Sequence, residues 1–239
     1  RSGIIFIKSA TKNCNSNSLA NQTTFMRRCI NSNSAATYNC PFMIGNTNSK
    51  ITGNARPGNI FAGVVNPTLG YGIKGVIWYQ GENNADRPAQ YRTLFPALIE
   101  DWRRQWGYQF PFLFVQLAGF GANKAEPAEY PWAELREAQA MSLSLFATGM
   151  ATAIDLGNEQ DIHPTNKQDV ARRLVRAAAK TAYGEDVVFS GPTFRSMHVE
   201  GNRARIKFAN LGSGLSIKDR YGYVRGFEVA AADGRFRWA

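Results

Sequence analysis

The sequence predicts an α/β protein whose central parallel β-sheet is covered by helices, followed by the start of a β-rich module. Three apolar runs suited to buried strands alternate with three amphipathic segments suited to helices. Prolines stand near the starts of the helical segments, and glycines stand near the ends of two of them. Because strand–helix–strand units use right-handed crossovers, we expect neighbouring strands to be parallel.

The first segment, residues 1–54, differs from the rest of the chain. It is crowded with Asn, Ser and Thr and contains no Asp or Glu. Only "GIIFIKSA", residues 3–10, has the pattern of a short buried strand. We therefore expect loops or a poorly defined structure over most of this atypical segment.

The first clear strand–helix unit lies in residues 73–107. "IKGVIWYQ" (73–80) is a continuous run of apolar, β-branched and aromatic residues, which is typical of a strand covered on both faces. After Pro88, apolar residues recur every three or four positions, which predicts a helix that ends at Gly107. These residues are Tyr91, Leu94, Phe95, Leu98, Ile99, Trp102 and Trp106. We expect the Tyr and Trp side chains of this helix to lie in the core.

Two further strand–helix units follow. "FPFLFVQLA" (110–118) and "GMATAIDLG" (149–157) have the pattern of buried strands. The segments 131–145 and 164–184 have the pattern of helices, each opened by a proline. Ligands of parallel sheets bind beyond the carboxyl ends of the strands, so the loops that follow these strands are the expected site.

The last part of the chain predicts short strands separated by glycine-containing turns. The expected organisation is an atypical segment over residues 1–54, an α/β domain over 55–186 and a β-rich segment over 187–239.

Composition excludes several classes of protein. The net charge is +10, but the basic residues are scattered and no stripe alternates basic with aromatic residues, so we expect a solvated basic surface and no nucleic-acid partner. No apolar run is long enough to span a bilayer. Three cysteines, an odd number without a C-x-x-C pair, do not predict a zinc ribbon or a complete disulfide framework, and their pairing stays open.

A candidate acid–base pair lies in "DIHP", after the last strand of the sheet. Asp161 and His163 are one residue apart, so a turn can bring the carboxylate to the imidazole. In hydrolases such a carboxylate fixes the tautomer of a histidine that acts as the general base. The alternative is a surface histidine beside a helix-capping aspartate.

The loop "YQGENN" supplies further candidates. The amide of Gln80 could donate a hydrogen bond to the oxygen that gains charge in a tetrahedral intermediate, or it could cap a neighbouring backbone. Gly81 permits a close approach of substrate or backbone. Glu82 is expected to orient neighbouring loops, and Asn83 completes the polar rim.

Two other interpretations concern charge. Arg136, in "WAELREAQ", could hold a substrate carboxylate, although an ion pair with a neighbouring acid is favoured. Glu82, Asp155, Asp161 and His163 could meet at one rim, but no metal-binding spacing supports a metal site. We expect neither a metal nor an organic cofactor.

Several ordered motifs resemble the sialate O-acetylesterase family over about residues 56–239. These motifs are "WYQGENNA", "FPFLFVQLAGF", "WAELREAQ", "DLGNEQDIHPTNK" and "GFEVAAADGRF". The resemblance implies a three-layer sandwich like that of SGNH hydrolases and a serine esterase that removes acetyl groups from O-acetylated sugars. It implies His163 as the base, Asp161 as its orienting acid and Gln80 as an oxyanion donor, with an acetylated sugar or glycan as the partner. It also implies a secreted, periplasmic or lysosomal location.

The sequence departs from this family at the nucleophile. The family's early G-Q-S-N motif is absent, and only "NSN" occurs, at Ser16 and Ser32. Ser16 is the candidate nucleophile, although neither serine follows the glycine that the sharp turn needs. Three alternatives stay open: a chain that begins downstream of the nucleophile, first residues that do not represent the family's sequence, or a non-catalytic sugar-binding homologue.

Overall fold

A parallel four-stranded sheet forms the centre of the protein in a computed structural model. The model describes residues 3–7, 61–122, 125–201, 203–216, 226–230 and 234–238. The strands are β1 (Gly3–Ile7), β2 (Ile73–Trp78), β3 (Phe112–Gln116) and β4 (Thr148–Thr152), in that spatial order. Every pair is parallel, as the alternation of strands and helices predicted.

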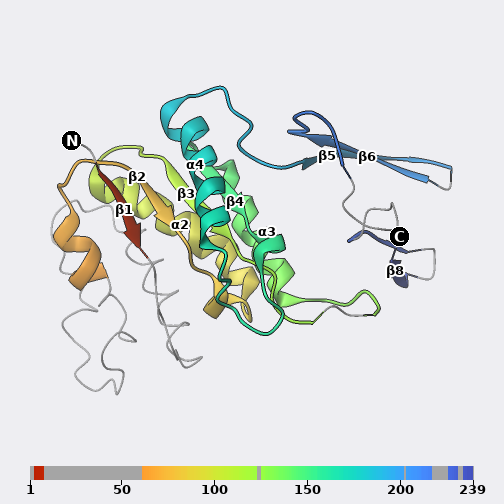
Figure 1. The fold of residues 1–239 in the computed structure, drawn as a ribbon. Helices are drawn as coiled ribbons and strands as arrows, with labels where there is room; N and C mark the ends of the chain where they lie inside the picture. Colours follow the sequence, from red (N-terminus) through yellow and green to blue (C-terminus); the bar gives the residue numbers. More distant parts are fainter. Residues whose placement is uncertain are drawn as a thin grey trace, which may run out of the picture.

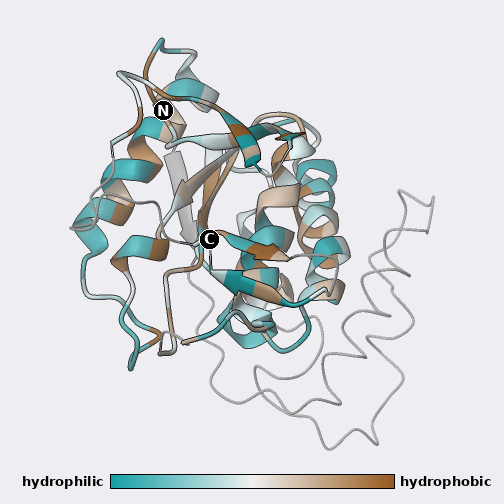
Figure 2. Cartoon of the chain, turned by 90° about the vertical axis from the view of Figure 1, so that its right-hand side faces the viewer, coloured by the Kyte–Doolittle hydropathy of each residue, from teal (hydrophilic) through white to brown (hydrophobic). Residues whose placement is uncertain are grey.

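Helices cover both faces of this sheet (Figures 1 and 2). Helices α2 (Pro88–Trp106) and α3 (Pro131–Met141) contact each other on one face, and α4 (Lys167–Tyr183) packs on β4 and β3 from the other. The predicted three-layer sandwich is therefore confirmed.

The side chains of β3 show how its apolar run builds two cores. Phe112 and Phe114 are fully buried in the core on the side of α2 and α3. Leu113 and Val115 are buried in the core on the side of α4. Because successive side chains of a strand point to opposite faces, a strand covered on both sides must be apolar throughout.

The aromatic residues of α2 lie in the core, as predicted. Tyr91, Phe95 and Trp102 are buried, and Trp78 of β2 lies 5.8 Å from Trp102 in an edge-on arrangement, measured between ring centroids. Such pairs contribute about 1 kcal/mol each beyond the area that they bury. The α2 face of the sheet is therefore held largely by aromatic contacts.

The helix ends follow their capping residues. α2 ends at Gly107, which adopts the left-handed conformation with a φ of 77°. The prediction that the last helix opens at Pro164 is wrong, because α4 begins at Lys167. The side chain of Asn166 accepts a hydrogen bond from the backbone N–H of Asp169 at 3.1 Å and so caps this helix.

Short helical turns complete the α/β domain. A π-helical turn spans Phe61–Val65, and 3₁₀ turns span Asn66–Thr68, Glu82–Asn84, Ser142–Ser144 and Ile154–Leu156. Two of them, Glu82–Asn84 and Ile154–Leu156, follow β2 and β4 and so shape the carboxyl edge of the sheet.

Two antiparallel ribbons follow the α/β domain, as the turn-rich tail predicted. β5 (Thr193–Glu200) pairs with β6 (Arg203–Ala209), and β7 (Glu228–Ala230) pairs with β8 (Phe236–Trp238). The ribbon of β5 and β6 stands apart from the sheet and its helices (Figure 1). No helix in the described part of the chain is long and apolar enough to cross a membrane.

Candidate active site

The carboxyl edge of the sheet is formed by loops that are hydrogen-bonded to one another. The backbone N–H of Gly119, after β3, donates to the carbonyl of Ile154, after β4, at 3.1 Å. Two residues further, Gly121 donates to the carbonyl of Glu159 at 3.1 Å. A Cβ added to Gly157 would lie 1.9 Å from the carbonyl oxygen of Gly119, so glycine is required for this approach. We call this edge, with the loops after β2, β3 and β4, the rim.

Asp161 and His163 are in direct contact on the rim. His163 Nδ1 lies 3.0 Å from Asp161 Oδ1, and the backbone N–H of His163 donates to the same oxygen at 2.8 Å. These two hydrogen bonds, the backbone one first, hold the pKa of Asp161 below its usual range. Because an ionised carboxylate only accepts, Nδ1 carries the proton and Nε2 is left as the basic nitrogen. Asp161 is not a helix cap, because Asn166 has that role.

Lys167 connects this loop to the end of β2. Its Nζ donates to the carbonyl of Pro164 at 2.5 Å and lies 5.4 Å from the centroid of the Tyr79 ring. Burial, with a smaller contribution from the charge of Glu82, raises the pKa of Tyr79 to about 12, so its phenol stays neutral. Tyr79 immediately precedes Gln80, and the two candidate segments are therefore neighbours on the rim.

The Gln80 side chain is held in one orientation by two partners. Its Oε1 accepts from the hydroxyl of Tyr91 at 3.1 Å, and its Nε2 donates to Asn84 Oδ1 at 2.8 Å. Burial raises the pKa of Tyr91 well above its ordinary value, so this hydroxyl remains a donor. An amide nitrogen carries two hydrogens, so one N–H of Gln80 remains for another acceptor.

Gln139 is the main residue of the rim that sequence reasoning missed. It is fully buried on α3, its Oε1 accepts from the backbone N–H of Leu117 at 2.9 Å, and its Nε2 donates to the carbonyls of Gln80 and Val115, each at 3.2 Å. One side chain thus joins the ends of β2 and β3. Its position four residues after Leu135, on the buried face of α3, was the available signal.

Gly81 is crowded by the same helix. Its φ is 155°, and an added Cβ would lie 3.1 Å from Gln139 Nε2 and 3.2 Å from Leu135 Cδ2. A side chain at this position would displace the glutamine that holds the rim together.

The remaining predicted residues lie nearby without forming one cluster. Glu82 and Asn83 are half-buried in the turn after Gln80, and the carbonyl of Asn83 accepts from Arg87 Nη2 at 3.3 Å. The ion pair favoured for Arg136 is wrong, because no acid in the described part of the chain pairs with it. The Nη1 atom of Arg136 is buried without a hydrogen-bond partner, and burial lowers the pKa of the Arg136 guanidinium.

The structure does not locate the nucleophile. The described rim loops, 79–87, 117–122, 125–130 and 153–166, contain no serine. The candidate Ser16 lies outside the described residues. Ser142 is buried at the end of α3, where its carbonyl accepts from Thr148 at the start of β4, so it belongs to the opposite edge of the sheet.

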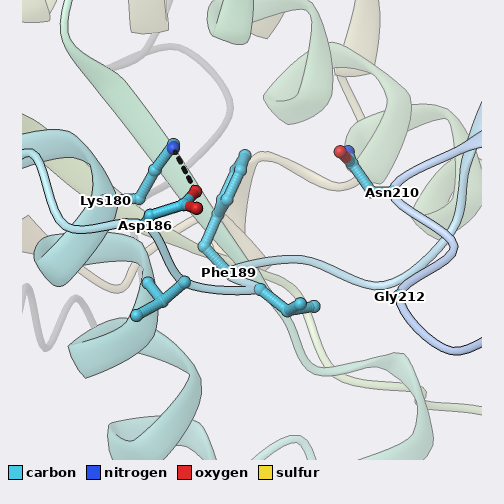
Figure 3. Close-up of a pocket in the computed structure, with 7 residues that line it drawn as sticks. Lys180, Asp186, Phe189, Asn210 and Gly212 are labelled. Atoms are coloured by element: carbon cyan, nitrogen blue, oxygen red, sulfur yellow. Dashed lines mark hydrogen bonds and ion pairs between the residues drawn. The ribbon is translucent and has the colours of Figure 1, made fainter.

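No metal cluster marks the described part of the rim. No group of three or more metal-binding side chains comes together among the described residues, and Asp155 is paired with Arg173 at 2.6 and 2.7 Å. A hollow of about 270 Å³ lies elsewhere, between Lys180 near the end of α4, Phe189 and the turn at Asn210 (Figure 3). Because Thr181 of α4 adjoins Gly149 at the start of β4, this hollow is at the far edge from Asp161.

Known proteins are similar to this chain in both sequence and fold. Residues 59–180 match the family model described as "Carbohydrate esterase, sialic acid-specific acetylesterase". The chain is 36% identical to the sialate O-acetylesterase of Mus musculus over 173 residues, which is 64% of this chain and 31% of that protein. It is 35% identical to the sialate O-acetylesterase of Homo sapiens over 162 residues, which is 59% of this chain and 31% of that protein.

A solved structure agrees with these matches. A carbohydrate acetylesterase from Xanthomonas citri superposes with a TM-score of 0.65 at 46% sequence identity, covering 72% of this chain and 40% of that one. The chain thus spans less than half the length of the relatives that it matches.

The fold and its rim define an α/β protein of the SGNH-hydrolase-like class, with a parallel sheet between helices. Within that class, the chain belongs to the carbohydrate esterase family of sialic acid-specific acetylesterases. The matched region contains Gln80, Asp161 and His163.

Proposed function

We propose that this chain carries the base and the oxyanion donor of a serine esterase that removes acetyl groups from O-acetylated sugars. The observation that supports this most is the 3.0 Å contact between His163 Nδ1 and Asp161 Oδ1 on the carboxyl edge of the sheet. A carboxylate on Nδ1 leaves Nε2 to take a proton, which is the arrangement that activates a serine. The names of the related proteins supply the substrate class, an acetylated sugar.

The proposed reaction has two acyl-transfer steps. His163 Nε2 takes the proton of a serine hydroxyl while its Oγ attacks the acetyl carbonyl, and the free N–H of Gln80 stabilises the resulting oxyanion. The imidazolium then returns the proton to the departing sugar oxygen, which leaves an acetyl-serine. Water, deprotonated by the same imidazole, releases acetate and restores the serine.

The nucleophile is proposed to come from the stretch that follows β1. Ile7, the last residue of β1, pairs with Trp78, so this stretch leaves the sheet at the same edge as Gln80. Ser9 follows in the sequence, and Ser16 comes later; both are outside the described residues. The stretch after a strand that ends beside Gln80 is the simplest source of a serine for the rim, because the described rim loops contain no serine.

The first experiment is acetate release from 4-nitrophenyl acetate, before and after treatment with a fluorophosphonate, with mapping of the labelled peptide. Labelling of one serine in residues 8–54 together with loss of turnover supports the esterase. Absence of turnover and of labelling in a folded protein supports the second candidate, a non-catalytic sugar-binding homologue. That candidate is favoured by the lack of a serine in the described rim loops.

Replacing Gln80 with alanine is expected to lower kcat about 10²- to 10³-fold with little change in KM, because the lost N–H acts on charge that develops in the transition state. The fold should survive, since Tyr91 retains the backbone carbonyl of Gln80 as an acceptor at 3.2 Å. The matched control is Gln105→Ala, the same chemical change at the far end of α2. Equal losses in the two variants would contradict the role of Gln80.

Arg136 is proposed to favour a sugar that carries a carboxylate, such as sialate. Its guanidinium has a buried Nη1 without a partner, and burial of an unpaired cation is costly unless an anion joins it. We therefore expect a higher kcat/KM for O-acetylated sialate than for a neutral acetylated sugar. A higher kcat/KM for the neutral sugar would contradict this role of Arg136. The secreted, periplasmic or lysosomal location stays a prediction.

A further inference from the structure

We propose that the ribbon of β7 and β8 forms a second sugar-binding site beside the rim, which holds a pyranose ring of a glycan next to the acetylated sugar. This inference rests on the proposed esterase function, because it extends the substrate from a single sugar to a chain of sugars. It is carried by a contact between the ribbon and the rim and by the side chains that the ribbon exposes there.

The contact is made by the last strand. The indole Nε1 of Trp238 donates to the backbone carbonyl of Ala125 at 2.9 Å, across 113 residues of sequence. Ala125 lies in the loop between β3 and α3, and Figure 1 shows β8 beside the end of this loop. The same loop is bonded to the Asp161 segment through Gly121 and Glu159, so the ribbon borders the rim.

One face of the ribbon has the chemistry of a sugar platform. Trp238 and Phe236 are two residues apart on β8, so their rings share a face, and they remain 47% and 61% exposed. Glu228 is paired directly with Trp238 and Ala230 with Phe236, which places both on that face as well. The aromatic ring faces are negative and attract the C–H bonds of a pyranose, while the carboxylate accepts hydrogen bonds from its hydroxyl groups.

The exposure of these rings needs an explanation that packing does not give. Aromatic side chains on a protein surface are most stable when a partner covers them, and Trp238 is already fixed in place by its N–H. The ring face left open therefore presents a rigid surface at little entropic cost to a ligand. Ala230, the residue paired with Phe236, adds only a methyl group to this face.

Trp238→Ala in the full chain tests this site. We expect kcat/KM to fall about tenfold for O-acetylated xylotetraose and for 9-O-acetylated sialyllactose, the loss of one stacking contact. O-acetylated xylose, 9-O-acetylated sialic acid and 4-nitrophenyl acetate should be hydrolysed as before, because none of them reaches the ribbon. The matched control is Val229→Ala, an exposed apolar residue on the opposite face of the ribbon.

Equal effects of Trp238→Ala on large and small substrates, or none on either, would overturn the proposal. A separate titration with deacetylated xylotetraose and sialyllactose, followed by calorimetry, distinguishes this failure from failure of the esterase. If the wild-type chain hydrolyses no acetyl ester but binds either glycan about tenfold more tightly than Trp238→Ala does, the sugar site stands alone. If it hydrolyses esters and the two proteins bind both glycans equally, the sugar site is wrong.

Discussion

Replacing His163 with alanine is expected to lower kcat/KM for 4-nitrophenyl acetate on the order of 10⁴-fold, the largest effect of any single change in this chain. The imidazole takes and returns a proton in both steps of the proposed reaction, and no other histidine lies in the described rim loops. Because the side chain of His163 is 67% exposed, its removal should leave the melting temperature almost unchanged.

The chain provides a matched control in its second histidine. His198 is an exposed residue of β5, opposite Arg205 in the ribbon that stands apart from the sheet. His198→Ala should therefore retain full activity. A loss of less than tenfold in His163→Ala, with the nucleophile labelled as before, would show that a different group acts as the base.

Replacing Asp161 with asparagine is expected to lower kcat about 10³- to 10⁴-fold, the second largest effect. The amide oxygen can still accept both hydrogen bonds from His163, at Nδ1 and at the backbone N–H, so the loop should keep its shape. What is lost is the negative charge that fixes the tautomer and stabilises the imidazolium, so Asp161 acts as a positioning residue.

Asp169→Asn is the matched control for this change. Asp169 is also held below its ordinary pKa by hydrogen bonds, from Asn166 first and then Arg172, but it serves the start of α4. Nitrogen NMR of the imidazole adds a readout that a purely structural role would not alter. The proton on Nδ1 of His163 should be retained in Asp169→Asn and partly lost in Asp161→Asn, and an unchanged spectrum in both would contradict the assignment.

Sequence patterns predicted the sheet and its helices well because both cores impose simple periodicities. β3 had to be apolar throughout, and α2 had to be apolar every three or four residues, since each packs against the other. The start of α4 was misplaced because Pro164 is a familiar first residue of helices, whereas the actual cap, Asn166, is followed three positions later by Asp169. Asparagine is among the residues favoured at the N-cap, so Asn166 could have identified the start.

The site was predictable only where neighbours in sequence are neighbours in space. Asp161 and His163 are two positions apart, so their contact could be anticipated. The contacts of Gln139 could not be anticipated, because its partners at positions 80, 115 and 117 lie on β3 and in the loops after β2 and β3. Only its place four residues after Leu135 indicated that it is buried. The ion pair expected for Arg136 failed for a related reason, because its buried surroundings are set by tertiary packing.

The hydrogen bonds that Gly119 and Gly121 donate from the loop after β3 to the segment after β4 have a consequence for how the rim moves. Amide hydrogens in loops usually exchange with solvent quickly, because a loop opens without disturbing the rest of the fold. These two amides donate to the segment after β4 instead, so exposing either one requires the loops after β3 and β4 to separate. The loop that bears Asp161 should therefore open only when it separates from the loop after β3, whereas the exposed ribbon of β5 and β6 can unfold on its own.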